Sequence, residues 1–142
     1  MNPAGYSGTP LSTKLGIKAG SRVALLHAPG GFDDELAPLP DGVTILRRLA
    51  ADLDVAVLFV TERRELERRF PAVAAAITPA GGLWVAWPKR ASKVPTDVTE
   101  DVLREVGLPQ GLVDNKVCAV DATWSGLRFV FRLEDRPPKA AN

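Results

Sequence analysis

The 142-residue chain has little of what holds metals or forms disulfides, with one cysteine, Cys118, and one histidine, His27. A single cysteine excludes a disulfide within the chain, and two such residues are too few for a Cys/His zinc site. The carboxylates of the chain could bind magnesium, but no sequence pattern marks a metal site. We therefore expect no resident metal, and we expect Cys118, which lies in an apolar run, to be a small core residue.

Net charge and long apolar runs are also lacking. The 18 Lys and Arg residues and 17 Asp and Glu residues leave a net charge of +1. This balance offers no electrostatic reason to bind nucleic acid or an anionic membrane. No run reaches the roughly 18 apolar residues of a membrane span, and the start of the sequence has no segment of signal-peptide type. We expect a cytoplasmic protein with neither a nucleic-acid nor a membrane partner.

The length fits one compact domain, and 46% hydrophobic residues suffice for its core. Residues 1–20 are rich in Gly, Pro, Ser and Thr and are expected to form an N-terminal arm packed on the domain. A single α/β domain is expected over 21–132 and a flexible tail over 133–142. Three apolar side chains are the expected anchors of the arm: Leu11, Leu15 and Ile17.

Short apolar runs bounded by turn signals predict strands. They span residues 22–28, 43–49, 54–60, 83–87, 116–124 and 127–132. Helices are predicted within 30–39, from an N-cap at Thr61 to about Ile77, and from an N-cap at Asp97 to Gly107. Pro71 is expected to interrupt the second of these, either as a kink or as the first residue of a new helix. Turns are predicted at 78–82 and, as a hairpin, at Ser125–Gly126. This alternation predicts a three-layer α/β domain whose doubly wound, mostly parallel sheet ends in an antiparallel hairpin.

The stretches DLDVAVLFV and ITPAGGLWVAW resemble the fourth strand and the turn into the fifth strand of class I S-adenosylmethionine methyltransferases. The matching residues are Asp54, Val55 and Val57 in the first stretch and Pro79, Gly81, Gly82 and Leu83 in the second. The closing hairpin is similar to the last two strands of that family. The resemblance covers about residues 20–132 and implies a Rossmann-like, methyltransferase-like fold.

The whole chain also resembles a small bacterial family classified as a domain of unknown function. The segments AGYSGTPL, LWVAWPKRASKVPTD and GLVDNKVCAVDATWSGLR carry this likeness. It implies a fold similar to that of the methyltransferases and no established activity.

Two departures from the methyltransferase pattern concern its cofactor. The loop after the first strand reads LLHAPGGF where the family has D-x-G-x-G-x-G; Pro29 lacks an N–H donor, and only Gly30 and Gly31 remain. Arg47 and Arg48 stand where the family has an acidic residue for the ribose hydroxyls. We therefore expect no bound S-adenosylmethionine and no other cofactor, and we interpret HAPGGF as a remodelled turn beside a possible anion pocket.

His27 lies at the carboxyl end of the first strand, where open α/β sheets place their ligands. It is either a general base or anion contact, or a histidine bonded within its own loop. The loop WPKRASKVPTD brings Lys89, Arg90 and Lys93 before a helix N-terminus, and together these would hold a phosphate or carboxylate. The alternative is a solvated basic loop whose helix is capped by Asp97.

The remaining candidates for a functional site are aromatic and acidic residues. Trp84 and Trp87 are three residues apart, so a regular strand places them on opposite faces, and Trp87 and Trp124 are the expected rim residues. Asp121 is expected to pair internally with Lys116 or Arg128. The charges of residues 62–69 alternate in sign, which indicates a solvated helix face.

Three functions remain open. The first is a non-catalytic binding or regulatory domain that kept the fold and lost the cofactor loop. The second is an enzyme or sensor for a small phosphate- or carboxylate-bearing ligand bound at residues 89–97. The third is a subunit of a protein assembly. The sequence indicates no particular reaction, because a lone histidine without a nucleophile positioned beside it specifies none.

Overall fold

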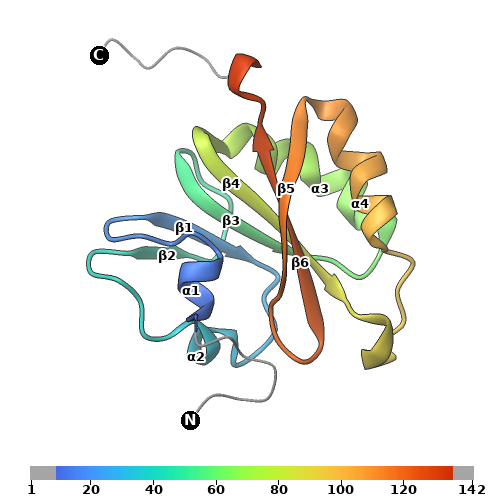
Figure 1. Cartoon of the computed structure of the whole chain (residues 1–142), viewed down its shortest axis with the longest axis horizontal. Helices are drawn as coiled ribbons and strands as arrows, with labels where there is room; N and C mark the ends of the chain where they lie inside the picture. The colour runs from blue at the N-terminus through green and yellow to red at the C-terminus, as the bar shows by residue number, and fades with distance from the viewer. Residues whose placement is uncertain (1–8, 136–142) are drawn as a thin grey trace.

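The computed structural model describes residues 9–135 of the chain, which form a six-stranded sheet with helices on both faces (Figure 1). The strands are β1 (Arg22–Leu26), β2 (Thr44–Leu46), β3 (Leu53–Phe59), β4 (Ile77–Pro88), β5 (Leu112–Ala119) and β6 (Trp124–Phe131). The α-helices are α1 (Leu11–Lys14), α2 (Phe32–Leu36), α3 (Arg63–Ala76) and α4 (Glu100–Gly107). Short 3-10 helical turns lie at Arg90–Ser92, Leu108–Gln110 and Leu133–Asp135.

The strand order is β2-β1-β3-β4-β6-β5. The first four strands in this order pair in parallel, whereas β6 runs antiparallel to both β4 and β5. Strand β2, which follows β1 in the chain, lies on one side of β1, and the next strand, β3, lies on the other side. The switch point, where an open α/β sheet has room for a ligand, is therefore at the carboxyl ends of β1 and β3. The predicted fold class is confirmed.

Two apolar clusters sandwich the sheet and give the three layers. Leu66 and Phe70 of α3 and Leu103 of α4 pack on one face. Leu11 of α1 and Phe32 of α2 pack on the other face. Figure 1 shows α3 and α4 together on one side and α1 and α2 together on the other. The central strands β1, β3 and β4 are largely buried and apolar because both of their faces are covered.

The arm is held by the expected anchors, since Leu11, Leu15 and Ile17 are all buried. The indole Nε1 of Trp84 donates to the carbonyl of Leu15 at 3.0 Å, which ties the arm to β4. Trp87 belongs to the opposite cluster, so the prediction that the two tryptophans face opposite sides is confirmed. The outer parts of the predicted arm and tail, residues 1–8 and 136–142, lie outside the described residues.

The predicted helix starts were wrong. Helix α3 has Glu62 at its N-cap position, not Thr61, and it is one helix from Arg63 to Ala76, so no second helix starts at Pro71. Packing of its apolar stripe against the sheet outweighs the hydrogen bond that Pro71 cannot donate. Helix α4 is capped by Thr99, whose Oγ1 accepts from Val102 at 3.2 Å, and not by Asp97. The predicted end at Gly107 is confirmed.

Two predicted turns were also wrong. Residues 78–82 belong to β4, which leaves regular pairing with β3 there, because Leu53 pairs with Ile77 but Val55 pairs with Gly82. Ser125 and Gly126 lie inside β6, and the chain reverses at residues 120–123. In that turn the Asp121 carboxylate accepts from the backbone N–H groups of Thr123 and Trp124 at 2.7 and 2.8 Å. An Asx-type turn thus replaces the Ser-Gly turn.

The helices between residues 9 and 135 are all too short or too polar to cross a bilayer.

Candidate functional site

The loop after β1 has an unusual backbone. Strand β1 ends at Leu26, and His27 adopts a φ of +63°, a region that side chains other than glycine rarely occupy. Gly31, with a φ of +85°, starts α2, which is only five residues long. The His27 side chain is exposed and makes no hydrogen bond or ion pair within residues 9–135. Its expected bond within the loop is therefore absent, and the strained backbone presents the imidazole to solvent.

A groove of about 590 Å³ opens beside His27, and we name it the arginine groove. Its floor is apolar and consists of Leu26 of β1, Leu58 of β3 and Val73 of α3, all buried. Its rim carries four arginines, from the segment after β2 and from α3: Arg47, Arg48, Arg68 and Arg69. Leu49 on the rim is 40% exposed. The volume suits a small molecule, and an apolar floor under a cationic rim suits an amphipathic anion.

Acidic partners neutralise part of this rim. Asp33 of α2 accepts from Nη1 of Arg47 at 2.8 Å, and a second Arg47–Asp33 hydrogen bond makes the pair bidentate. The Glu65 carboxylate accepts from Arg68 at 2.8 Å and from Arg69 at 2.8 Å. The hydrogen bonds from Arg69 and Arg68 lower the pKa of Glu65 to about 2, so this carboxylate is ionised at neutral pH.

Arg48 differs from the other rim arginines. Its guanidinium is exposed and has no ion pair within the part of the chain that the structure describes. With four arginines against the two carboxylates that pair with them, the rim keeps an excess of two positive charges. Arg48 is therefore the rim cation most available to a ligand.

A smaller cavity of about 240 Å³ lies at the switch point itself and shares His27 and Arg69 with the groove. Thr61, Phe59 and Trp124 complete much of its wall. Phe59 makes an edge-to-face contact with Trp124, with ring centroids 5.1 Å apart, which holds the half-buried indole at the carboxyl edge of the sheet. The expected rim role of Trp124 agrees with this position. Trp87, in contrast, is only 8% exposed and packs in the core.

Glu35 of α2 and Asp121 of the β5–β6 turn form a carboxyl pair near this cavity. Partial burial and the hydrogen bond to Asp121 raise the pKa of Glu35 to about 7. The Asp121 carboxylate also accepts from the backbone N–H groups of Thr123 and Trp124, which fixes it beside Glu35. The expected pairing of Asp121 with Lys116 or Arg128 was wrong, because its carboxylate bonds to the backbone of its own turn instead.

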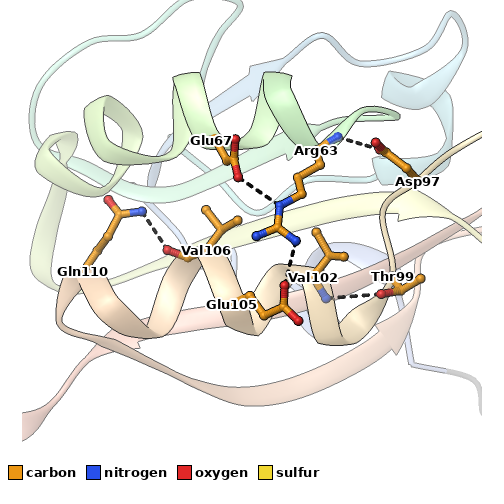
Figure 2. Close-up of polar contacts among 8 residues, drawn as sticks. All are labelled: Arg63, Glu67, Asp97, Thr99, Val102, Glu105, Val106 and Gln110. Carbon is orange, nitrogen blue, oxygen red and sulfur yellow. Dashed lines mark hydrogen bonds and ion pairs between the residues drawn. The ribbon is translucent and has the colours of Figure 1, made fainter.

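The basic loop after β4 is arranged differently from the sequence-based prediction. Asp97 does not cap α4; its Oδ1 accepts from the backbone N–H of Arg63 at 2.6 Å, at the first residue of α3 (Figure 2). In Figure 2 the Arg63 side chain reaches from α3 to Glu67 and, across to α4, to Glu105. The loop segment between β4 and α4 thus caps a helix that precedes it in the chain.

The cations of this loop remain accessible. Arg90 and Lys93 are exposed, Lys89 is half-buried, and no ion pair joins any of them within residues 9–135. Lys93 has a φ of +63°, and the backbone of Lys89 donates to Thr123 at 2.8 Å. Because α4 begins only at Glu100, its N-terminus is not where the predicted anion site requires it. Anion binding by the loop stays a prediction.

Sequence reasoning missed part of the groove. Arg68 and Arg69 were assigned to a solvated helix face, although Arg69 follows Leu66 by three residues and therefore borders the buried stripe of α3. That spacing was the available signal. The Glu35–Asp121 pair had no such signal, because only the tertiary fold brings α2 next to the β5–β6 turn. Among the described residues, no cluster of three or more His, Cys, Asp or Glu side chains forms a metal site.

No protein-family model matches the sequence, and no curated protein matches it. Solved structures do match in fold. Fibrillarin, a pre-rRNA processing protein of Methanococcus jannaschii, aligns with a TM-score of 0.60 at 12% identity over 87% of this chain and 69% of its own. Magnesium protoporphyrin IX methyltransferase (ChlM) of Synechocystis, solved with bound SAM, aligns with a TM-score of 0.57 at 8% identity over 86% of this chain and 74% of its own.

TrmN of Thermus thermophilus is similar to the same degree, with a TM-score of 0.54 at 12% identity over 86% of this chain. The chain spans only 47% of that protein's length. At such identities the likeness extends to the fold alone. The chain therefore has the Rossmann-like fold of the S-adenosylmethionine methyltransferases, with a mostly parallel sheet and an antiparallel C-terminal hairpin.

Proposed function

We propose that this chain is a non-catalytic binding domain that uses the methyltransferase fold without S-adenosylmethionine and takes a small amphipathic anion in the arginine groove. One observation carries the proposal. Arg47 and Arg48 directly follow β2, at the edge of the sheet where the methyltransferase pattern has a ribose-binding acid. A cationic rim in that place favours a carboxylate or phosphate over ribose hydroxyls.

The loop after β1 supports the same conclusion. His27, Ala28 and Pro29 stand where the glycine-rich loop would pass close to a cofactor. A hypothetical Cβ at Gly30 or Gly31 meets no atom within 4 Å, so neither glycine is required by close packing within the protein. Gly31 is instead suited to its positive φ at the start of α2. The loop therefore has the features of a structural turn that borders the groove.

Thermal unfolding with added ligands tests the proposal. Phenyl phosphate and benzoate join an apolar ring to an anionic group and are the probes. A ligand at 100 times its Kd stabilises the folded state by about 2.7 kcal/mol. We expect phenyl phosphate to raise the Tm of the full chain, and Arg48→Gln to remove most of this rise. S-adenosylmethionine and S-adenosylhomocysteine should leave the Tm unchanged.

The matched control is Arg132→Gln, which removes an exposed arginine that follows β6 and does not line the groove. It should keep the phenyl phosphate response. A Tm rise with S-adenosylmethionine would overturn the proposal and restore a methyltransferase. A phenyl phosphate response that survives Arg48→Gln but is lost in Lys93→Ala would move the site to the basic loop of Lys89, Arg90 and Lys93.

A further inference from the structure

One ion pair on the rim of the arginine groove joins two elements of the fold. Nη1 of Arg47, directly after β2, donates to Oδ1 of Asp33 in α2 at 2.8 Å, and the second hydrogen bond makes the contact bidentate. Arg47 lines the groove, whereas Asp33 lies outside its lining. The protein's own carboxylate therefore occupies a rim arginine in the way that the anionic group of a ligand would.

The packing of α2 sets the position of Asp33. The neighbouring side chains Phe32 and Leu36 of this five-residue helix are both buried. The ring of Phe32 also makes an edge-to-face contact with Phe59 of β3, with ring centroids 5.0 Å apart. The hydrogen bond from Arg47 lowers the pKa of Asp33, so this carboxylate is ionised at neutral pH. The fold thus holds a negative charge beside Arg47.

The Arg47–Asp33 pair is open to exchange with a ligand. Its side chains are 57% and 56% exposed. An exposed pair of this kind shifts an equilibrium constant by up to about fivefold. The other paired rim cations, Arg68 and Arg69, share the carboxylate of Glu65, which is 31% exposed and holds both of them within the single helix α3. Arg47 is therefore the paired rim cation that a ligand releases most easily.

Charge decides which anions can use Arg47. Arg48 has no ion pair within residues 9–135 and takes the first negative charge of a ligand. A ligand with one negative charge is then neutralised and gains nothing when the neighbouring ion pair opens. A phosphate monoester carries a charge of about −1.5 to −2 at neutral pH and has three acceptor oxygens. Its second charge can replace the carboxylate of Asp33, so that one phosphate group accepts from Arg47 and Arg48 together.

We propose that Asp33 competes with ligands for Arg47: it holds Arg47 in the free protein and releases it to a phosphate monoester, whose charges are then neutralised by Arg47 and Arg48. This inference rests on the proposed function and narrows its ligand class from amphipathic anions to phosphate monoesters. The exchange needs only exposed side chains to move. Competition by Asp33 weakens the apparent affinity by up to about fivefold, because Arg47 is available in only a fraction of the molecules.

Calorimetric titration of the full chain with phenyl phosphate and phenyl sulfate, at neutral pH and constant ionic strength, tests the proposal. The two ligands have the same tetrahedral shape, but the sulfate ester carries a single negative charge. Asp33→Asn removes the competing charge and should tighten phenyl phosphate binding by up to about fivefold. Phenyl sulfate binding should stay close to its wild-type Kd.

The matched control is Asp34→Asn. Asp34 is the next residue in the first turn of α2, is exposed, and has no ion pair within residues 9–135. This variant changes the net charge and the charge at the helix terminus in the same way as Asp33→Asn, and it should keep the wild-type Kd for both ligands. Adding Arg47→Gln to Asp33→Asn should cancel the gain, because the released arginine is the group that the ligand uses.

Amide NMR of the wild-type chain gives a readout that needs no substitution. Asp33 lies outside the groove, so its amide and those of its neighbours in α2 report the release of Arg47. Phenyl phosphate should shift these amides, and phenyl sulfate should not. The same spectra show whether each variant keeps the fold.

Equal gains in Asp33→Asn and Asp34→Asn would overturn the competition, because they would show an effect of net charge alone. A gain that survives Arg47→Gln, or α2 amides that respond equally to both ligands, would overturn it as well. In each of these cases a phenyl phosphate response that is lost in Arg48→Gln still supports the proposed function. Failure of phenyl phosphate to bind both the wild type and Asp33→Asn would overturn the proposed function and this inference together.

Discussion

The capping of α3 by Asp97 leads to a prediction whose magnitude follows from the structure. The Asp97 Oδ1 accepts from the N–H of Arg63 at 2.6 Å and occupies the N-terminus of α3, although 34 residues separate the two in sequence. Replacing an N-cap acceptor with alanine costs typically about 1 kcal/mol. Loss of a charge beside the helix dipole adds about 0.3 kcal/mol, the low end of the range, because Asp97 is exposed.

Asp97→Ala should therefore lower the free energy of unfolding by about 1.3 kcal/mol. An unfolding entropy of about 2.1 cal/mol/K per residue makes this a drop in Tm of about 4 °C for a chain of this length. Asp97→Asn keeps the acceptor and removes only the charge, so its loss should be about 0.3 kcal/mol. Urea denaturation at equal m-values measures both.

The control is Asp101→Ala, which removes an acidic residue from the first turn of α4 whose side chain is 89% exposed. Its closest basic partner, Arg104, is 3.7 Å away, so this change should stay within about 0.5 kcal/mol. A loss in Asp97→Ala no larger than that in Asp101→Ala would contradict the capping of α3 by Asp97. A loss in Asp97→Asn as large as that in Asp97→Ala would contradict it too.

Three further predictions concern other parts of the molecule. The pKa of Glu35 is raised to about 7 in the folded state, so the folded chain holds a proton there that the unfolded chain has already lost. The stability that protonated Glu35 contributes is therefore present at acidic pH and is lost as the pH rises towards and through 7. Urea midpoints from pH 4 to 8 should show this loss, and Glu35→Gln should flatten the pH dependence. Trp84→Phe leaves the buried carbonyl of Leu15 without its donor and should cost about 1–3 kcal/mol by urea denaturation, with near-UV circular dichroism as a check on the fold. Gly107→Ala places a Cβ 2.6 Å from Cε1 of Phe129 and should destabilise by about 1–3 kcal/mol despite the better helix propensity of alanine; a rise in Tm would contradict that contact.

The arginine groove lies where the sequence pattern alone suggests a loop for a cofactor. An apolar strand that ends in HAPGGF lies where a mononucleotide-binding fold has its phosphate loop, and the structure does place His27 at the switch point. The neighbouring chemistry differs, because Arg47 and Arg48 follow β2. A cationic rim over an apolar floor supports binding of an anion in place of a nucleoside.

The amino-acid sequence was enough to predict the fold class. Continuous apolar runs such as VAVLF between turn signals need cover on both faces, and this requirement leads to a parallel sheet with helices on either side. It also determined the anchors of the arm and the end of α4 at Gly107, because each depends on local periodicity or on one residue type. His27 and the Arg47–Arg48 pair were found for the same reason, from their place directly after strands.

The contacts between segments far apart in the chain depend on the three-dimensional fold and could not be predicted from the sequence. Asp97 reads locally as the cap of the helix that follows it, yet it caps α3, because the packing of α3 against α4 brings that N-terminus within 2.6 Å. Glu35 lies beside Asp121, which helps to raise the pKa of Glu35, because the fold brings α2 next to the β5–β6 turn. The irregular pairings of β4 with β3 and of β5 with β6 depend on the register between strands. Local propensity contains no information on such pairings, since each depends on where the rest of the chain places its partner.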